Sequence, residues 1–155
     1  MSDKTVIRPQ GEGKPIWMLG GLYEVKASGD ETGGSATVME MTIPEGSGPP
    51  PHTHAGGEIT YIIEGSAVYQ FDGEKREAHA GTVVYFPKGT LETFEPIGPG
   101  PLRLLIIYTP GGVDKFFEEA GEPAPRREVP PPMTAPPDLE RLSQIASRYG
   151  LELRP

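Results

Sequence analysis

The sequence predicts an all-β fold whose antiparallel strands form a sandwich or a sheet closed into a barrel. Its 155 residues fit one domain and are enough to bury a continuous core. From Pro15 to Pro110, short runs rich in Val, Ile, Tyr and Thr each end at Gly, Pro or Asp-Gly. No helical pattern interrupts these runs, and many short strands at this spacing indicate antiparallel pairing in such a fold.

The individual strands follow from these runs. Asp72-Gly73 provides the positive φ angles of a tight type I′ hairpin, and Gly65 has a similar role between two neighbouring runs. We interpret Trp17 and Tyr23 as packing residues near the barrel edge. The predicted strands lie near residues 16–19, 22–27, 35–43, 58–64, 66–71, 75–79, 82–86, 91–95 and 102–109.

After Pro110 the pattern changes to helix and connector. Residues 113–120 predict a short helix with Phe116 and Phe117 on its apolar side. Glu122–Pro137 is rich in Pro, which excludes helix and central strand, so this segment is expected to run extended over the surface.

A second helix is expected after this connector. Asp138 is the predicted N-cap and Gly150 the stop. One stripe of this helix is apolar: Leu139, Leu142, Ile145, Ala146 and Tyr149. We therefore divide the chain into a barrel, residues 1–112, and a C-terminal helical segment, residues 113–155, packed on it.

Composition excludes several classes of partner and chemistry. The net charge of −8, without a Lys/Arg cluster, argues against nucleic acid. The chain has no Cys, so a metal would be held by nitrogen and oxygen atoms. No run of residues has the length and apolarity of a membrane span, and residues 1–10 lack the apolar core of a signal peptide. We expect a cytoplasmic protein without a membrane partner.

The residues that carry chemistry lie in the stretch GSGPPPHTHAGGEITYIIEG. His52 and His54 are two residues apart, so an extended backbone directs both imidazoles to the same face. A turn at residues 55–57 would bring Glu58 to the same point. Two imidazoles and a carboxylate, with room left for water or substrate, suit one divalent ion among Fe, Mn, Ni, Co and Zn.

This stretch resembles the first motif of the cupin superfamily, G-(X)5-H-X-H-(X)3-E-(X)6-G. Every fixed position is matched, by Gly46, His52, His54, Glu58 and Gly65. The resemblance covers residues 35–110 and implies a single jelly-roll barrel that binds a metal.

The second cupin motif, G-(X)5-P-X-G-(X)2-H-(X)3-N, is matched only in part. Gly81, Pro87 and Gly89 are present, but Glu92 stands where the family has its fourth metal ligand, a His, and Pro96 stands where it has Asn. Three outcomes follow. Glu92 ligates the metal, or it acts as a general base beside it, or the metal is lost and the pocket is kept.

The catalytic candidates are thus Glu58 and Glu92, and the metal-ligand candidates are His52, His54, Glu58 and Glu92. Strand alternation predicts a mainly apolar cavity beside them. His79 lies outside both motifs and is expected to be exposed. The predicted pocket residues are Met39, Met41, Thr60, Ile62, Tyr69, Phe86, Phe94 and Ile106.

The C-terminal segment adds a narrower resemblance. FFEEAGEPAP and PPDLERLSQIASRYGLEL are similar to the ends of bacterial single-domain cupins described as quercetin-dioxygenase-like. This implies a metal-dependent dioxygenase acting on a small aromatic, polyketide-like or enolisable molecule. Two alternatives remain: a Lewis-acid isomerase or cyclase, and a non-catalytic module that binds a small molecule. By analogy with cupins we also expect a homodimer, paired through the edge strands at residues 16–27.

Overall fold

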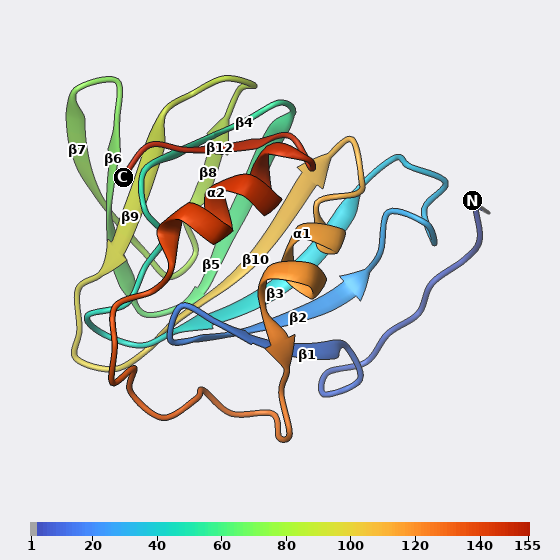
Figure 1. The fold of residues 1–155 in the computed structure, drawn as a ribbon, viewed down its shortest axis with the longest axis horizontal. Coiled ribbons are helices and arrows are strands. Elements are labelled where there is room, and N and C mark those ends of the chain that lie inside the picture. The colour runs from blue at the N-terminus through green and yellow to red at the C-terminus, as the bar shows by residue number, and fades with distance from the viewer. Residues whose placement is uncertain (1–2) are drawn as a thin grey trace.

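The protein is a two-sheet β-barrel with a helical C-terminal segment, seen in a computed structural model that describes residues 3–155 (Figure 1). The larger sheet has the strand order β11-β1-β2-β3-β10-β5-β8 and the smaller sheet the order β12-β4-β9-β6-β7. The strands are β1 (Lys14–Met18), β2 (Gly21–Ala27), β3 (Thr37–Ile43), β4 (His52–His54), β5 (Gly57–Glu64), β6 (Ser66–Phe71), β7 (Glu74–His79), β8 (Val83–Phe86), β9 (Glu92–Pro96), β10 (Leu102–Thr109), β11 (Glu122–Pro123) and β12 (Leu151–Leu153). The predicted all-β jelly-roll fold is confirmed.

Each of the nine predicted strands is present, with its ends shifted by at most a few residues. The hairpin between β6 and β7 turns at Asp72 and Gly73, whose φ angles of 50° and 76° are those that a type I′ turn requires. Three further short strands had no signal in the sequence. β4 follows three prolines, β11 includes Pro123, and β12 lies behind a helix, so each depends on a partner strand far away in the chain. Since β11 pairs with β1, this part of the edge at residues 16–27, which was expected to join a second copy, is already occupied.

The barrel core follows from strand alternation. On β3, Met39, Met41 and Ile43 are buried while the residues between them are only partly buried. Leu102 and Leu104 on β10 lie opposite Ile43 and Met41 and are fully buried. The inward rows of the two sheets therefore form one apolar interior.

The C-terminal segment lies over this barrel. Helices α1 (Asp114–Ala120) and α2 (Leu139–Ser147) cover one face (Figure 1). α2 begins as predicted, because the Asp138 side chain accepts a hydrogen bond from the backbone N–H of Arg141. The segment also adds a strand to each sheet, since β11 pairs with β1 and β12 pairs with β4.

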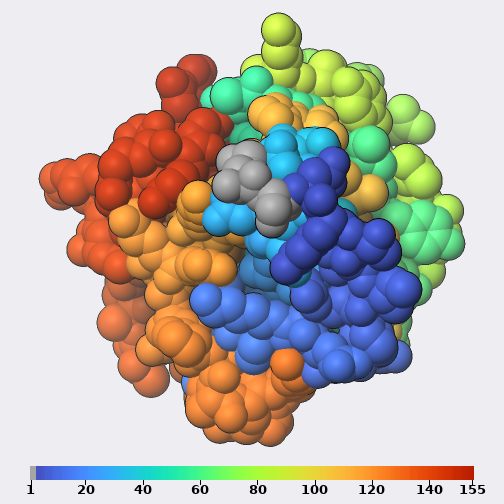
Figure 2. Space-filling model, turned by 90° about the vertical axis from the view of Figure 1, so that its right-hand side faces the viewer, coloured from blue at the N-terminus to red at the C-terminus, as the bar shows by residue number. Residues whose placement is uncertain are grey.

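The Pro-rich connector is fixed to the N-terminal strands. Trp17 Nε1–H donates to the Glu128 carbonyl, and the Arg126 guanidinium lies 5.0 Å from the centre of the Trp17 ring. Arg127 pairs with the Glu24 carboxylate at 2.8 Å. In Figure 2 the orange residues that follow α1 accordingly lie against the blue N-terminal strands.

A buried carboxylate joins α1 to the barrel. Asp114 is buried, and its Oδ1 accepts hydrogen bonds from the Thr37 hydroxyl at 2.6 Å and from the Gly29 N–H at 3.0 Å. Thr37 Oγ1 in turn accepts from the Gly112 N–H at 2.9 Å. This network connects the start of α1 to β3 and to the loop before it.

Replacing this carboxylate is expected to destabilise the protein. Asp114→Ala leaves buried donors on Thr37 and Gly29 unpaired, so we expect a loss of about 2–4 kcal/mol in the free energy of unfolding. Urea denaturation followed by circular dichroism measures it. The control is Glu118→Ala on the same helix, whose partly exposed side chain should change stability by less than about 0.5 kcal/mol. Equal effects of the two substitutions would refute the network's role.

Among residues 3–155, no helix is both long enough and apolar enough to cross a membrane.

Candidate metal centre

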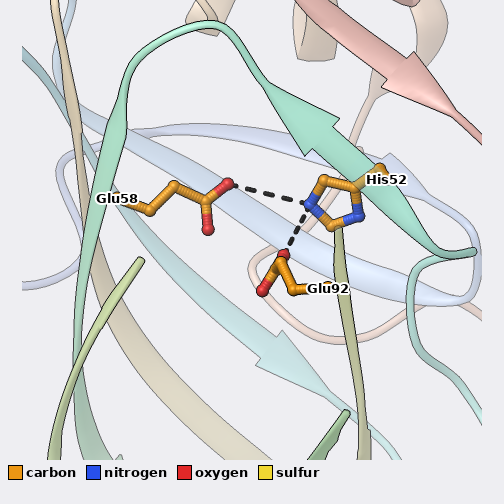
Figure 3. Close-up of side chains that lie close together, drawn as sticks. All are labelled: His52, Glu58 and Glu92. Carbon is orange, nitrogen blue, oxygen red and sulfur yellow. Dashed lines mark ion pairs between the residues drawn. The ribbon is translucent and has the colours of Figure 1, made fainter. Parts of the chain in front are cut away.

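Three buried side chains converge inside the barrel. His52, Glu58 and Glu92 each offer one ligand atom, and these atoms all lie within 4.8 Å of one another. Figure 3 shows the two carboxylates directed at the same ring nitrogen of His52. The structure thus brings together three of the four predicted ligands.

Both sheets contribute to this cluster. His52 on β4 lies directly opposite Glu92 on β9 in the smaller sheet. Glu58 comes from β5 of the larger sheet, where its neighbours across the strands are Phe86 and Tyr108. The centre is therefore held between the sheets, and its geometry depends on how they pack.

A close turn places Glu58 after the His-X-His strand. A Cβ atom at Gly56 would collide with the backbone carbonyl of Thr109, so this position requires glycine. The turn allows the chain to leave β4 in one sheet and enter β5 in the other. The predicted turn at residues 55–57 is therefore present.

The hydrogen bonds of His52 define what its imidazole can do. Nδ1 lies 3.0 Å from the Pro50 carbonyl oxygen, which can only accept, so Nδ1 carries a proton. Nε2 lies 2.7 Å from Glu92 Oε1 and 3.7 Å from Glu58 Oε1. It therefore faces two carboxylates, an arrangement that is favourable only with a proton or another cation between them.

The local charges determine how tightly that proton is held. Burial alone would lower the pKa of His52, but hydrogen bonding and charge from Glu58 and Glu92 outweigh it and raise the pKa to about 10. For Glu92 the sign is opposite, because burial disfavours a charged carboxylate: burial raises the pKa of Glu92, and its hydrogen bond with His52 only partly opposes this. Without a metal, the His52–Glu92 pair holds a proton at neutral pH.

The donor set fits a divalent ion. Glu58 Oε1 is buried and has no hydrogen-bond partner among the described residues, which is costly for a carboxylate oxygen unless a ligand satisfies it. A doubly charged ion could take the place of the shared proton between the imidazole nitrogen and the two carboxylates. The charges of the ion and the two carboxylates would then cancel, so the centre would be formally neutral. This donor set is nitrogen and oxygen, as the absence of Cys requires.

His54 lies beside this cluster but is not one of its three donors. It is buried on β4, on the same face as His52, and its ring packs edge-on against Tyr108 with centroids 5.3 Å apart. Burial lowers its pKa, so it is neutral at pH 7. Its Nδ1 has no hydrogen-bond partner within residues 3–155. A role of His54 as a metal ligand stays a prediction.

An apolar cavity of about 60 Å³ adjoins the cluster. His52, Glu58 and Glu92 line it, and so do three predicted pocket residues, Met41, Phe94 and Ile106. The C-terminal segment closes it with side chains whose contact with the site the sequence did not reveal: Phe116, Phe117, Leu142, Leu151 and Leu153. For the two phenylalanines and Leu142 the signal was the apolar side of each predicted helix, whereas Leu151 and Leu153 lie on β12, which had no signal in the sequence.

The remaining predicted pocket residues lie elsewhere. Met39, Thr60 and Ile62 are buried in the barrel core and do not line this cavity. Tyr69 and Phe86 border a different depression, between β8 and the β6–β7 hairpin. His79 is exposed, as expected.

Known proteins with similar sequence or structure agree with this architecture. Residues 39–108 match the family model described as Cupin domain. An uncharacterized protein of Methanocaldococcus jannaschii is 36% identical over 75 residues, which are 48% of this chain. The match covers 60% of that protein, which is less than two thirds of its length.

Two solved structures are also similar. A predicted oxalate decarboxylase from Thermotoga maritima is 26% identical with a TM-score of 0.61, covering 66% of this chain and 97% of that one. Bacillus subtilis oxalate decarboxylase, described with Mn(II) centres, is 28% identical with a TM-score of 0.57, covering 65% of this chain and 29% of that one. These likenesses support a barrel of this type.

Proposed function

Since the chain belongs to the cupin superfamily, we propose that it is a metal-dependent enzyme acting on a small organic molecule. His52, Glu58 and Glu92 would hold one divalent ion. The observation that carries this proposal is a buried cluster of three donors beside an apolar cavity, with one carboxylate oxygen of Glu58 that has no hydrogen-bond partner within residues 3–155. Convergent polar groups on an apolar wall are typical of a catalytic or binding site.

The chain's residues would bind the substrate and move a proton. A bound ion would polarise a substrate oxygen and, if it is Fe or Mn, would supply redox chemistry. Glu92 already pairs with His52, so Glu58 is the better base for an enol or phenol proton, through the carboxylate oxygen that would not bind the ion. The surrounding Phe and Leu side chains would keep water from this proton transfer.

The cavity favours a small, mostly uncharged substrate. Among the described residues that line it, none is Lys or Arg, and the donor set would make the metal centre formally neutral. A dianion such as oxalate would therefore be desolvated without a compensating charge. We propose an aromatic or enolisable molecule instead. A volume of about 60 Å³ holds only a few waters, so the C-terminal cover must move to admit it.

Two reactions share this proton transfer. Dioxygenation consumes O₂ after the substrate has lost its proton, as the resemblance to quercetin-dioxygenase-like cupins implies. Isomerisation or cyclisation returns the proton to another atom and consumes none. We propose dioxygenation as the first reaction to assay, and an oxygen electrode with a panel of enolisable and phenolic compounds separates the two.

Metal analysis tests the site directly. We expect about one equivalent of Fe, Mn, Ni, Co or Zn in protein purified without a metal-affinity step, measured by plasma mass spectrometry. His52→Ala should remove it, because it deletes the nitrogen donor between the carboxylates. The matched control is His79→Ala, which removes an exposed imidazole. An empty wild-type protein that also refuses added metal would overturn the proposal.

One observation favours a second function, metal-free binding of a small molecule. The 2.7 Å pair between His52 and Glu92 already satisfies both groups with a proton in place of a metal. In that case the apolar cavity would bind its ligand without turnover. Binding of an apolar probe such as a naphthalene dye with equal affinity in chelator and in metal would support this reading.

A further inference from the structure

Two tyrosines line the cavity beside the metal centre and have no part in the proton transfer proposed above. Tyr23 on β2 and Tyr108 on β10 are only 4% and 5% exposed, and both border the cavity. Apart from His52, Glu58 and Glu92, they are the only described residues lining it whose side chains bear a nitrogen or oxygen atom. Their hydroxyls are therefore the polar groups that a ligand meets outside the metal centre.

Neither hydroxyl is satisfied by the protein. Burial raises the pKa of both, and within residues 3–155 no hydrogen bond to either hydroxyl adds to this shift or opposes it. Each hydroxyl thus keeps its proton at neutral pH and can donate it in a hydrogen bond. A buried donor without a partner is costly, and in native proteins such groups usually have water or a ligand as their partner.

Aromatic packing fixes the two rings in the cavity wall. The Tyr23 ring stacks on Phe117 of α1, with centroids 5.1 Å apart. The Tyr108 ring lies 6.4 Å from the same Phe117 and 5.3 Å from the His54 ring. Because these neighbours hold the rings in place, a ligand would find both donors already positioned and would spend little conformational entropy in ordering them.

The two tyrosines start from different distances to the metal centre. Tyr108 lies directly opposite Glu58 in the larger sheet, whereas Tyr23 lies opposite Met41 of β3. β10 is the neighbour of β5, and β2 lies two strands beyond β10. With strands about 4.8 Å apart, the backbone of Tyr23 is therefore well removed from Glu58. The wall offers one donor beside the metal centre and a second from farther along the sheet.

We propose that the hydroxyls of Tyr23 and Tyr108 select the substrate by donating hydrogen bonds to a neutral oxygen atom, so that the site takes ketones and related carbonyl compounds. This inference rests on the proposed function, because it names the substrate class of the same site. A carbonyl oxygen accepts a hydrogen bond from a tyrosine without needing a counter-charge. A carboxylate would instead face Glu58 and Glu92, with no Lys or Arg among the described lining residues.

An enolisable ketone fits both the base and the donors. Its α-carbon bears the proton that the Glu58 carboxylate would accept, and the electron pair of the broken C–H bond moves to the carbonyl oxygen as the enolate forms. A hydrogen bond from Tyr108, whose neighbour across the strands is Glu58, becomes stronger as this oxygen gains negative charge. The same donor that selects the carbonyl would therefore also favour its deprotonation.

Two pairs of ligands of matched shape test the selection without any turnover. Acetophenone and α-methylstyrene differ in that C=CH₂ replaces C=O, and so do cyclohexanone and methylenecyclohexane. Calorimetric titration in chelator measures their affinities for the wild type and for the double variant Tyr23→Phe with Tyr108→Phe, which keeps both rings. In this variant the affinity for the ketones should fall about 3–10-fold, and that for the alkenes should not fall. Comparison within each pair cancels the greater hydrophobicity of the alkene.

The matched control is Tyr69→Phe. It removes a buried hydroxyl that also has no partner within residues 3–155 but does not line the cavity, so the ketone affinity should not change. Thermal unfolding without ligand gives a second readout. The double variant should have the Tm of the wild type or a higher one, because hydroxyls without a protein partner contribute no stabilising bond.

Three results would overturn the proposal. One is a parallel change of ketone and alkene affinities in the double variant, and another is a wild type that binds neither member of either pair. The third is a lower Tm of the ligand-free double variant, which would give the hydroxyls a structural role. Since all titrations are made in chelator, they need neither metal nor activity. Failure of the metal site and failure of the carbonyl selection are therefore seen separately.

Discussion

Metal-free protein is expected to lose stability as the pH rises from about 6.5 to about 10. His52 has an ordinary pKa of 6.5, and in the folded protein the carboxylates of Glu58 and Glu92 raise it to about 10. A base whose pKa is raised by folding stabilises the protein fully below its unfolded pKa, and this contribution is lost as the pH passes through the folded value. The loss should amount to several kcal/mol, because each pKa unit corresponds to about 1.4 kcal/mol.

A bound divalent ion is expected to reverse this trend. The ion must displace the proton on Nε2 of His52, so its affinity should rise by up to tenfold per pH unit below pH 10. At a concentration of about 100 times its Kd, the ion adds about 2.7 kcal/mol, or roughly 5–10 °C in Tm for a chain of this size. Thermal unfolding from pH 6 to 9, with chelator and with Zn²⁺ or Mn²⁺, measures both slopes.

Two variants identify the group responsible. His52→Gln should flatten the slope of the metal-free protein and abolish the metal-dependent gain in Tm, because it removes the titrating nitrogen. His79→Gln, which changes an exposed imidazole, should reproduce the wild-type slopes. A metal-induced gain in Tm that does not change with pH would show that no proton leaves His52, and the ion would then bind elsewhere.

The sequence predicted the strands well because their signals are local. Alternating apolar residues and the turn at Asp72-Gly73 depend on neighbours a few positions away, and the structure has these elements where they were expected. The register of Glu92 opposite His52 was not predictable in this way. It depends on β4, a three-residue strand that forms only because β9 and β12 lie on either side of it.

The residues that line the cavity were also only partly predictable from local sequence signals. The apolar stripe around Leu142 predicted that the second helix packs on something, but not that it closes the metal site. Leu151 and Leu153 lie there because β12 pairs with β4, which contains both motif histidines. Conversely, Met39 and Ile62 have the correct strand parity for the interior but do not line the cavity, although their cross-strand neighbours Ile106 and Leu104 are also buried. Parity gives the side of a sheet, and only the packing of the whole barrel determines which inward side chains reach the cavity.

Glu92→His is expected to change both metal affinity and metal preference. It restores the residue that the cupin motif has at this position and removes one of the carboxylates that hold a proton on His52. The pKa of His52 should fall, so that a metal competes with less proton at pH 7. A second imidazole at this position suits Zn²⁺, Ni²⁺ and Co²⁺ better than Mn²⁺. We expect at least tenfold tighter Zn²⁺ binding at pH 7, and less gain for Mn²⁺.

The metal-free form of this variant should also be less stable. Removal of one partner of a buried pair typically costs about 3–5 kcal/mol, and the remaining carboxylate of Glu58 would reduce this loss. Calorimetric titration measures the affinity, and thermal unfolding with and without metal measures the stability. The matched control is Glu95→His, which places an imidazole on the exposed side of the same strand and should change neither.

The outcome with substrate then separates the functions proposed for this barrel. If Glu92→His binds metal more tightly but loses turnover, the carboxylate of Glu92 takes part in the reaction itself, as base or as a ligand that lowers the charge of the centre. If the wild type has no activity and the variant acquires it, the native protein is a binding module in which Glu92 keeps His52 protonated. An unchanged rate at saturating metal would assign the proton transfer to Glu58, whose carboxylate faces the same centre.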